Sequence, residues 1–179
     1  MKRTHLFIVL TAVIFSACQQ TPPKIEEAPP KPVDLEAAKT EVGALLDNYH
    51  KTMKLKDAAE MAKILAEDGL YCGSDPKELW DKEAFSDYIR KAFADTSVII
   101  NYIVDKRKIR VAKDGNSAMA VEQFIDAASP KIQVRVVSHV IKDGTNWKLD
   151  FNSWGLVPAN EDLPKINEVV GNEGKPENQ

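Results

Sequence analysis

Few residues of this chain could do acid–base chemistry. His139 and Asp150 lie on two runs of alternating hydrophobicity joined by Asp143-Gly144, so an antiparallel hairpin would place them side by side. A carboxylate beside an imidazole can orient the ring as a general base. The pattern predicts no serine or cysteine nucleophile next to the pair. His139 and Asp150 are therefore weak catalytic candidates, and a purely structural pair is the alternative.

A second group of residues could line a pocket, because tyrosine and serine hydroxyls hydrogen-bond a ligand while indole rings supply apolar surface. Its members are Tyr71, Ser74, Trp80, Tyr88, Tyr102, Ser138 and Ser153. The pattern places no carboxylate base with them, and the chain has no cluster with metal-ligand spacing. We therefore expect a binding pocket without metal or cofactor, and an isomerase- or hydrolase-like enzyme using tyrosine donors is the alternative.

Two cysteines stand apart from each other, so they do not form a disulfide framework. Cys18 follows Lys2, Arg3, an apolar run at 6–15 and two small residues, which resembles the lipobox of bacterial lipoproteins. The run is too short to cross a bilayer. The resemblance implies that 1–17 is a signal peptide and that Cys18 is lipidated. Cys72 is predicted to be a small buried side chain.

The segment 18–34 is predicted to be a tether, because residues 19–34 contain five of the ten prolines. Sixteen extended residues of this kind reach roughly 50 Å. We therefore expect a domain anchored to a membrane of the bacterial cell envelope, facing the periplasm or the exterior. At the other end, 159–179 is predicted to be a polar tail that is partly disordered.

Composition limits the remaining possibilities. The 179 residues are 44% apolar, which suits one packed domain with tails. The formal net charge of −3 argues against a nucleic-acid-binding protein, which needs a basic surface.

The domain at 35–158 is predicted to begin with helices. Apolar residues recur at steps of three and four from Leu35 to Met53, with Asp34 as N-cap. Asp57 and Asp81 are the predicted caps of two further helices, and Gly69 is the predicted stop of the second. Residues 70–72 are predicted to form a short strand.

After residue 95 the period changes to two, which predicts about four antiparallel strands. A switch of parity in the first strand indicates a bulge at 106–108. A tight turn at 143–146 would put Lys142 opposite Trp147. The same register puts Ser138 opposite Phe151 and His139 opposite Asp150. It assigns Ser138 and Ser153 to the helix-facing side of the sheet and His139 and Trp154 to the other side.

This order of elements, together with the segments YCGSDPKELW at 71–80 and DGTNWKL at 143–149, resembles the SnoaL-like branch of the nuclear transport factor 2-like superfamily. The resemblance covers roughly 35–157. It implies an α+β cone in which three N-terminal helices pack in a strongly curved, mostly antiparallel sheet, with a pocket at the open end and often a dimer through the sheet.

The superfamily holds enzymes and non-enzymes alike, so the fold alone does not choose between them. We expect an envelope module that binds a small, mainly apolar ligand or a partner protein. A structural homodimer is a further alternative, and we expect no nucleic-acid partner.

Overall fold

A computed structural model describes residues 33–126 and 133–171. The predicted signal peptide, Cys18 and most of the predicted tether lie outside these residues, as does the predicted disorder at the end of the tail. In the part of the chain that is described, no helix is both long enough and apolar enough to cross a membrane.

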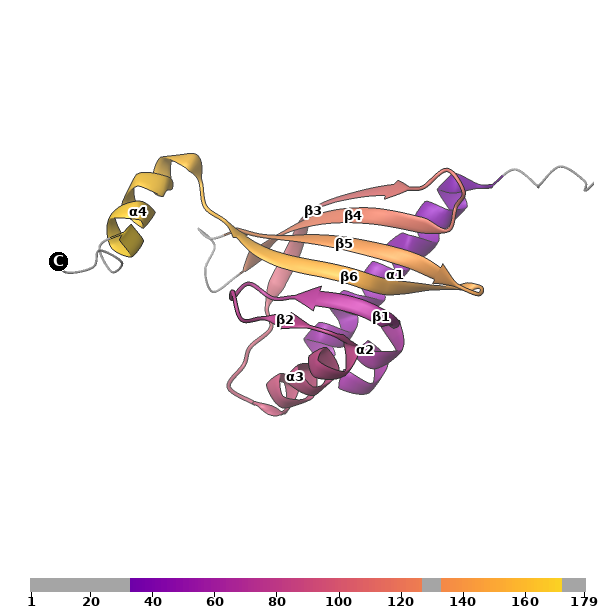
Figure 1. Cartoon of the computed structure of the whole chain (residues 1–179), viewed down its shortest axis with the longest axis horizontal. Helices are drawn as coiled ribbons and strands as arrows, with labels where there is room; N and C mark the ends of the chain where they lie inside the picture. Colours follow the sequence, from indigo (N-terminus) through magenta and orange to yellow (C-terminus); the bar gives the residue numbers. More distant parts are fainter. Residues whose placement is uncertain (1–32, 127–132, 172–179) are drawn as a thin grey trace, which may run out of the picture. The chain divides into compact units, whose positions relative to one another are not determined.

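The described part of the chain forms helices and the strands of one curled sheet (Figure 1). The elements are α1 (Leu35–Leu55), α2 (Ala58–Ile64), β1 (Leu65–Cys72), β2 (Leu79–Trp80), α3 (Lys82–Ala94), β3 (Tyr102–Val111), β4 (Ser117–Asp126), β5 (Gln133–Asp143), β6 (Asn146–Val157), the 3-10 turn η1 (Asn160–Asp162) and α4 (Leu163–Gly171). The sheet order is β2-β1-β6-β5-β4-β3, and only β1 and β6 pair in parallel.

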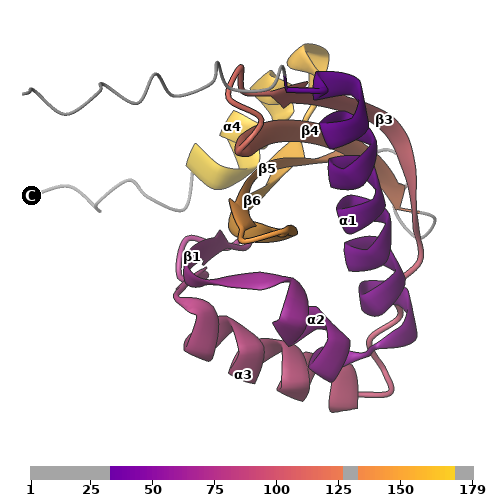
Figure 2. The ribbon, with the colours of Figure 1, turned by 90° about the vertical axis from the view of Figure 1, so that its right-hand side faces the viewer.

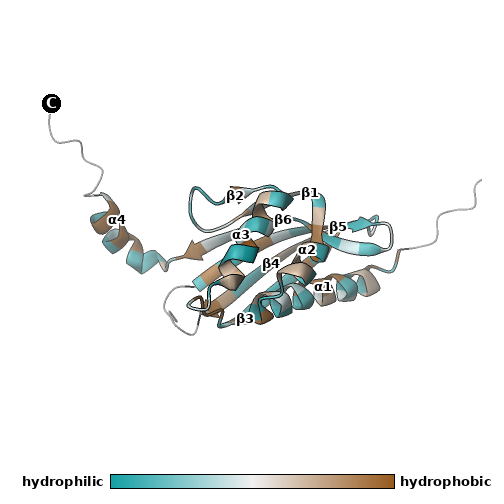
Figure 3. Ribbon diagram, turned by 90° about the horizontal axis from the view of Figure 1, so that it is seen from below, coloured by the Kyte–Doolittle hydropathy of each residue, from teal (hydrophilic) through white to brown (hydrophobic). Residues whose placement is uncertain are grey.

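The sheet curls so that α1 runs along one side of its concave face, while α2 and α3 lie below β1 (Figure 2). The predicted α+β class is confirmed. Hydrophilic and hydrophobic residues alternate along the helices that cover the sheet (Figure 3), as expected for helices with one buried face.

The three N-terminal helices begin where their aspartates predict. The Asp34 side chain accepts from the backbone N–H groups of Glu36 and Ala37. Asp57 accepts from Glu60, and Asp81 accepts from Ala84. Each aspartate satisfies a donor that the first helical turn leaves free, so all three predicted caps are confirmed.

The prediction that Gly69 ends the second helix is wrong. Helix α2 stops at Ile64, and β1 starts at once because buried Leu65 pairs with Leu149 of β6. Gly69 lies inside β1, where an added Cβ would collide with the ring of Tyr71. This glycine therefore makes room for a core side chain.

The pairing register shifts in β3, in β6 and in β1 between Leu65 and Leu70, and only the shift in β3 is predicted. In β3, Val104 pairs with Phe124 while Lys106 pairs with Gln123, so Asp105 is the extra residue. This confirms the bend of the first long strand, one residue before the predicted segment. In β6, Leu149 pairs with Val140 while Phe151 pairs with His139, which leaves Asp150 as the extra residue.

The β6 bulge corrects the predicted register. Lys142 faces Trp147 as predicted, but beyond Asp150 the pairing shifts by one, so Ser138 faces Asn152 and not Phe151. A shift by one residue exchanges the two faces of a strand. Asn152 and Trp154 therefore lie on the concave face, and Ser153 pairs with Val137 on the convex face.

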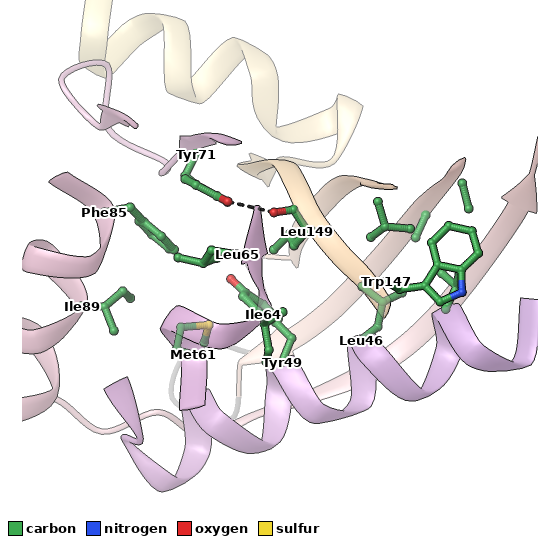
Figure 4. Packing of buried hydrophobic residues seen from close by; sticks show 14 of the residues in the cluster. Leu46, Tyr49, Met61, Ile64, Leu65, Tyr71, Phe85, Ile89, Trp147 and Leu149 are labelled. Carbon is green, nitrogen blue, oxygen red and sulfur yellow. Dashed lines mark hydrogen bonds between the residues drawn. The ribbon is translucent and has the colours of Figure 1, made fainter. Parts of the chain in front are cut away.

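The main core lies between α1, α3 and the concave face (Figure 4). Tyr71 is fully buried there, stacks on Phe85 with centroids 4.7 Å apart and donates its hydroxyl to the Leu149 carbonyl at 2.8 Å. Val42, Leu46 and Leu149 are at most 1% exposed, so α1 and β6 share one close-packed interior.

At the other end of the chain, α4 forms, but none of its residues is buried. Leu163, Ile166, Val169 and Val170 are 39–69% exposed.

Candidate functional site

An aromatic cavity opens between α1, α3, β6 and the loop that joins β1 to β2. Its volume is about 190 Å³. Its lining is mostly apolar, and Tyr49, Cys72, Ser74, Glu78 and Tyr88 are the lining residues with a polar or ionisable side-chain group. The lining residues are Tyr49, Met53, Cys72, Gly73, Ser74, Glu78, Trp80, Phe85, Tyr88, Ile89 and Trp154.

Helix α3 and strand β2 build the outer wall of this aromatic cavity. Phe85, Tyr88 and Ile89 are three and four residues apart, so they share one face of α3. Trp80 stacks on Tyr88 with ring centroids 4.5 Å apart and lies 5.6 Å from Phe85. The wall is therefore a set of flat aromatic surfaces that suits a flat apolar ligand.

Tyr88 lies at the rim of the cavity and is 41% exposed. Burial raises the pKa of its hydroxyl, and the nearby Glu78 charge raises it further. Glu78 is fixed in turn, because its carboxylate accepts from the backbone N–H of Asp75 at 3.0 Å. The rim thus offers a neutral phenol beside a carboxylate.

Tyr49 supplies the polar group at the inner wall. Burial raises its pKa to about 12, and hydrogen bonds from Trp154 and Asn152 offset only part of that effect. The Asn152 amide nitrogen donates to the Tyr49 oxygen at 3.2 Å. A phenol oxygen that accepts one hydrogen bond can still donate its own proton to a second partner. The Asn152 carbonyl oxygen is buried without a protein partner among the described residues.

A buried polar chain lies behind α1, next to the cavity. The Tyr102 hydroxyl is 2.9 Å from His50 Nδ1, and His50 Nε2 is 2.9 Å from Glu122 Oε2. An ionised carboxylate only accepts hydrogen bonds, so His50 donates to Glu122 from Nε2. In the neutral ring, Nδ1 is then the acceptor for the Tyr102 hydroxyl. Phe124 packs edge-on against the His50 ring, with centroids 5.2 Å apart.

Arg107 connects the buried polar chain to the surface. Its Nε donates to Glu122 Oε1 at 2.5 Å and its Nη1 donates to Asp47 at 2.7 Å. Burial by itself would lower the pKa of Arg107, but the hydrogen bonds and charges of Asp47 and Glu122 outweigh it and raise that pKa. Glu122, with a side chain 1% exposed, is thus compensated by a permanent cation.

The buried polar chain was not predicted from the sequence, although two signals in the sequence point to it. Glu122 stands at an inward position of β4, in phase with Ala118, Ala120 and Phe124. His50 is four residues after Leu46, at the edge of the buried stripe of α1. A charged residue in phase with buried ones indicates a buried polar partner.

The structure brings only some of the predicted pocket residues together. Ser74, Trp80 and Tyr88 line the aromatic cavity. Tyr71 does not, because it lies in the core, and its half-buried neighbour Cys72 lines the cavity instead. Cys72 is predicted to be a small buried side chain, whereas the structure leaves it half-buried at the cavity.

The other predicted residues lie elsewhere. Tyr102 belongs to the buried polar chain, and Ser138 is buried on the concave face without lining the cavity. Ser153 is on the convex face, because the bulge shifts it there. None of these three residues lines the aromatic cavity, so the structure does not bring them together with Ser74, Trp80 and Tyr88.

His139 and Asp150 do interact, but not as directly opposed residues. His139 Nδ1 is 2.8 Å and 2.9 Å from the two Asp150 oxygens, although His139 pairs with Phe151. The side chains are 32% and 24% exposed and lie away from the aromatic cavity. This geometry suits a structural pair on the convex face. Among the described residues, no group of three His, Cys, Asp or Glu side chains could hold a metal.

Comparisons with known proteins agree with this architecture. The model of the SnoaL-like domain family matches residues 42–151, which is more than half of the chain. No curated protein matches the chain.

Solved structures share the fold at low identity. An NTF2-like protein of unknown function from Pseudomonas putida KT2440 is 14% identical, with a TM-score of 0.59, over 67% of this chain and 87% of that one. A protein of unknown function with a cystatin-like fold from Nostoc punctiforme is 16% identical, with a TM-score of 0.54, over 68% and 92%. An uncharacterised cystatin-like protein from Caulobacter vibrioides is 14% identical, with a TM-score of 0.56, over 75% and 99%.

Proposed function

This chain belongs to the SnoaL-like domain family, and on that premise we propose that it is a binding module whose aromatic cavity holds a small, mainly apolar ligand. The observation that carries the proposal is the cavity of about 190 Å³ walled by Trp80, Phe85, Tyr88 and Trp154. Burial of a ligand's apolar surface in such a cavity favours binding by about 25 cal/mol per Å².

The walls and the inner polar group define the ligand further. The stacked rings of Trp80 and Tyr88 favour a flat molecule, and the volume limits it to a single ring with short substituents. Tyr49 lines the cavity and its hydroxyl can donate one hydrogen bond, which favours a ligand with one acceptor. A ketone or ester oxygen on an aromatic ring has this chemistry.

Acetophenone and isopropylbenzene test this proposal, because they have similar shapes and only acetophenone carries an acceptor. We expect acetophenone to bind more tightly when measured by calorimetry and by quenching of tryptophan fluorescence. Tyr49→Phe should remove the difference, which corresponds to roughly one hydrogen bond, or about 1 kcal/mol. Trp80→Ala should weaken both ligands about tenfold or more.

Trp147→Phe is the matched control, since Trp147 lies outside the aromatic cavity and donates to Glu41 at 2.8 Å. Binding by neither compound, or equal binding by wild type and Trp80→Ala, would contradict a ligand function for the cavity.

We further propose attachment to a membrane of the bacterial cell envelope through lipid on Cys18. The small residues before Cys18 and the proline-rich stretch after it support this proposal. A single acyl chain holds a protein only weakly, and several make anchoring stable. Cys18→Ser should move the protein from the membrane fraction to the soluble fraction, while Cys72→Ser should leave its fractionation unchanged. An unchanged fractionation of Cys18→Ser would refute lipid anchoring.

An acid–base enzyme is the second candidate, favoured by the buried polar chain. Tyr102, His50 and Glu122 form the order that triads use, in which a base takes a hydroxyl proton and a carboxylate orients the base. If wild type converts a ligand retained on purification and Tyr102→Phe leaves that ligand intact, the enzymatic function is supported. Equal conversion by both proteins would exclude this role for Tyr102.

A homodimer through the convex face of the sheet is the third proposal. Met119 and Val121 are 37% and 38% exposed there, and Phe151 and His139 lie on the same face. The earlier expectation that Trp154 belongs to this face is wrong, because the Asp150 bulge turns it inward. Val121→Lys should lower the sedimentation coefficient if this face pairs, and a wild-type monomer at micromolar concentration would refute the dimer.

A further inference from the structure

A second concave site lies between the second half of α1 and the first half of β3. This groove has a volume of about 750 Å³ and shares no lining residue with the aromatic cavity. We call it the basic groove, because Lys51, Lys54, Lys106 and Arg107 line it against two carboxylates, Asp47 and Asp105.

Both of these carboxylates are already paired with cations of the basic groove. Asp47 binds Arg107 at 2.7 Å, and Asp105 lies 3.8 Å from the Lys106 ammonium. Glu122, beneath the groove floor, also binds Arg107. Lys51 and Lys54 are the two cations of the groove outside these pairs. Neither makes an ion pair with any carboxylate in the described part of the chain.

Lys51 and Lys54 are placed to act together. They are three residues apart on α1, so their side chains leave the same face of the helix. The Lys54 ammonium lies over the Tyr102 ring, 5.5 Å from its centroid. This cation–π contact restricts the position of one of the two ammonium groups. With Glu122 counted, four cations meet three carboxylates, so the groove has a net charge of +1 in a chain whose net charge is −3.

An apolar lip borders these cations. Leu55 follows Lys54 and is 66% exposed, and Ile103 on β3 is 65% exposed. Both side chains line the basic groove. Large aliphatic side chains that are this exposed beside unpaired ammonium groups match a molecule with an acidic head and an aliphatic chain.

We propose that the basic groove binds an amphiphilic anion, with its acidic head between Lys51 and Lys54 and its aliphatic chain against Leu55 and Ile103. The chemistry is the same for a free aliphatic acid and for an anionic bilayer lipid. Ion pairing of the head and burial of the chain both contribute, so neither a simple anion nor a neutral alcohol satisfies the site.

Decanoate is the probe, and decanol of equal chain length is its uncharged counterpart. Binding is followed by NMR shifts of the backbone amides of α1 and β3, in the full chain carrying Cys18→Ser so that no lipid is attached. We expect decanoate to shift these amides, with an affinity about tenfold above that of decanol. Lys51→Gln/Lys54→Gln should lower the decanoate affinity about tenfold and weaken its dependence on salt.

The matched control is Lys77→Gln/Lys91→Gln, which removes the same charge from exposed lysines outside the basic groove. This variant should bind decanoate as wild type does. Trp80→Ala should also bind as wild type, which separates this site from the aromatic cavity and lets either proposal fail alone. Equal binding of decanoate and decanol, or equal losses in both lysine pairs, would overturn the proposal.

Vesicles distinguish the two sources of the anion. Phosphatidylglycerol in phosphatidylcholine vesicles should retain the protein more than pure phosphatidylcholine does, and Lys51→Gln/Lys54→Gln should abolish the difference, if a bilayer lipid is the ligand. Binding of decanoate without this lysine-dependent retention assigns the site to a free acid. Failure of both probes overturns the proposal.

Discussion

Glu122→Gln tests whether the buried polar chain stabilises the domain. The substitution keeps the side-chain volume but removes the charge that Arg107 and His50 share, at a position where the Glu122 side chain is 1% exposed. An amide offers a single acceptor oxygen to two donors, Arg107 Nε and His50 Nε2. One of these donors therefore loses its hydrogen bond inside the protein.

The magnitude follows from these contacts. Removing one partner of a buried ion pair costs about 3–5 kcal/mol, because the other charge stays buried without compensation. Arg107 keeps Asp47 at 2.7 Å and its side chain is 21% exposed, so the lower end of that range applies. We expect a loss of about 3 kcal/mol in the free energy of unfolding, which is roughly 10 °C in Tm for a domain of this size.

Urea unfolding followed by circular dichroism measures this loss at low and at high salt. The loss should be the same at both, because a buried pair is screened much less than a surface pair. Glu67→Gln is the control, since Glu67 is 87% exposed in its ion pair with Lys82 and should change stability by less than about 1 kcal/mol. If Glu122→Gln unfolds within that margin of wild type, the reasoning on the buried polar chain is refuted.

Three further predictions concern the same fold. Burial raises the pKa of Tyr49 to about 12, so the stability that its neutral form contributes is complete below pH 10 and falls as the pH rises toward 12. Tyr49→Phe should therefore reduce the loss of unfolding free energy between pH 9 and 11.5, measured by urea unfolding. An unchanged slope against pH would contradict the assignment. Asp81→Ala removes the cap of α3 and should cost about 1 kcal/mol by the same assay, against less than half of that for Glu83→Ala in the same turn. Leu149→Ala, at 1% exposure, should cost roughly 3 kcal/mol, whereas Leu70→Ala, at 45% exposure, should cost less than about 1 kcal/mol; equal costs would contradict the packing of the core.

Local patterns were sufficient for the helices and for most of the strands. The aspartate caps, the stripe of α1 and the Asp143-Gly144 turn each depend on residues within four positions of one another. Gly144 takes a φ of 61°, which is the left-handed conformation that the turn requires. Such features are determined by the sequence, because their interactions are local.

The site depended on contacts that no local pattern contains. The bulge at Asp150 exchanges the faces of the end of β6, so Trp154 and not Ser153 reaches the concave side and the aromatic cavity. Strand β6 pairs with β5 on one side and on the other with β1, which is far away in the sequence. The same holds for Tyr71, which looks like a pocket residue in the sequence but finds its partner at Leu149.

By itself, the sequence determined an α+β domain with three capped helices, a bent first long strand and two single cysteines. Only the tertiary structure decided that His50, Tyr102, Glu122 and Arg107 meet, because 72 positions separate His50 from Glu122 and 52 separate it from Tyr102. The physical reason is that burial of a charge is tolerated only where another element supplies its partner. That pairing is a property of the folded sheet against α1 and not of any segment alone.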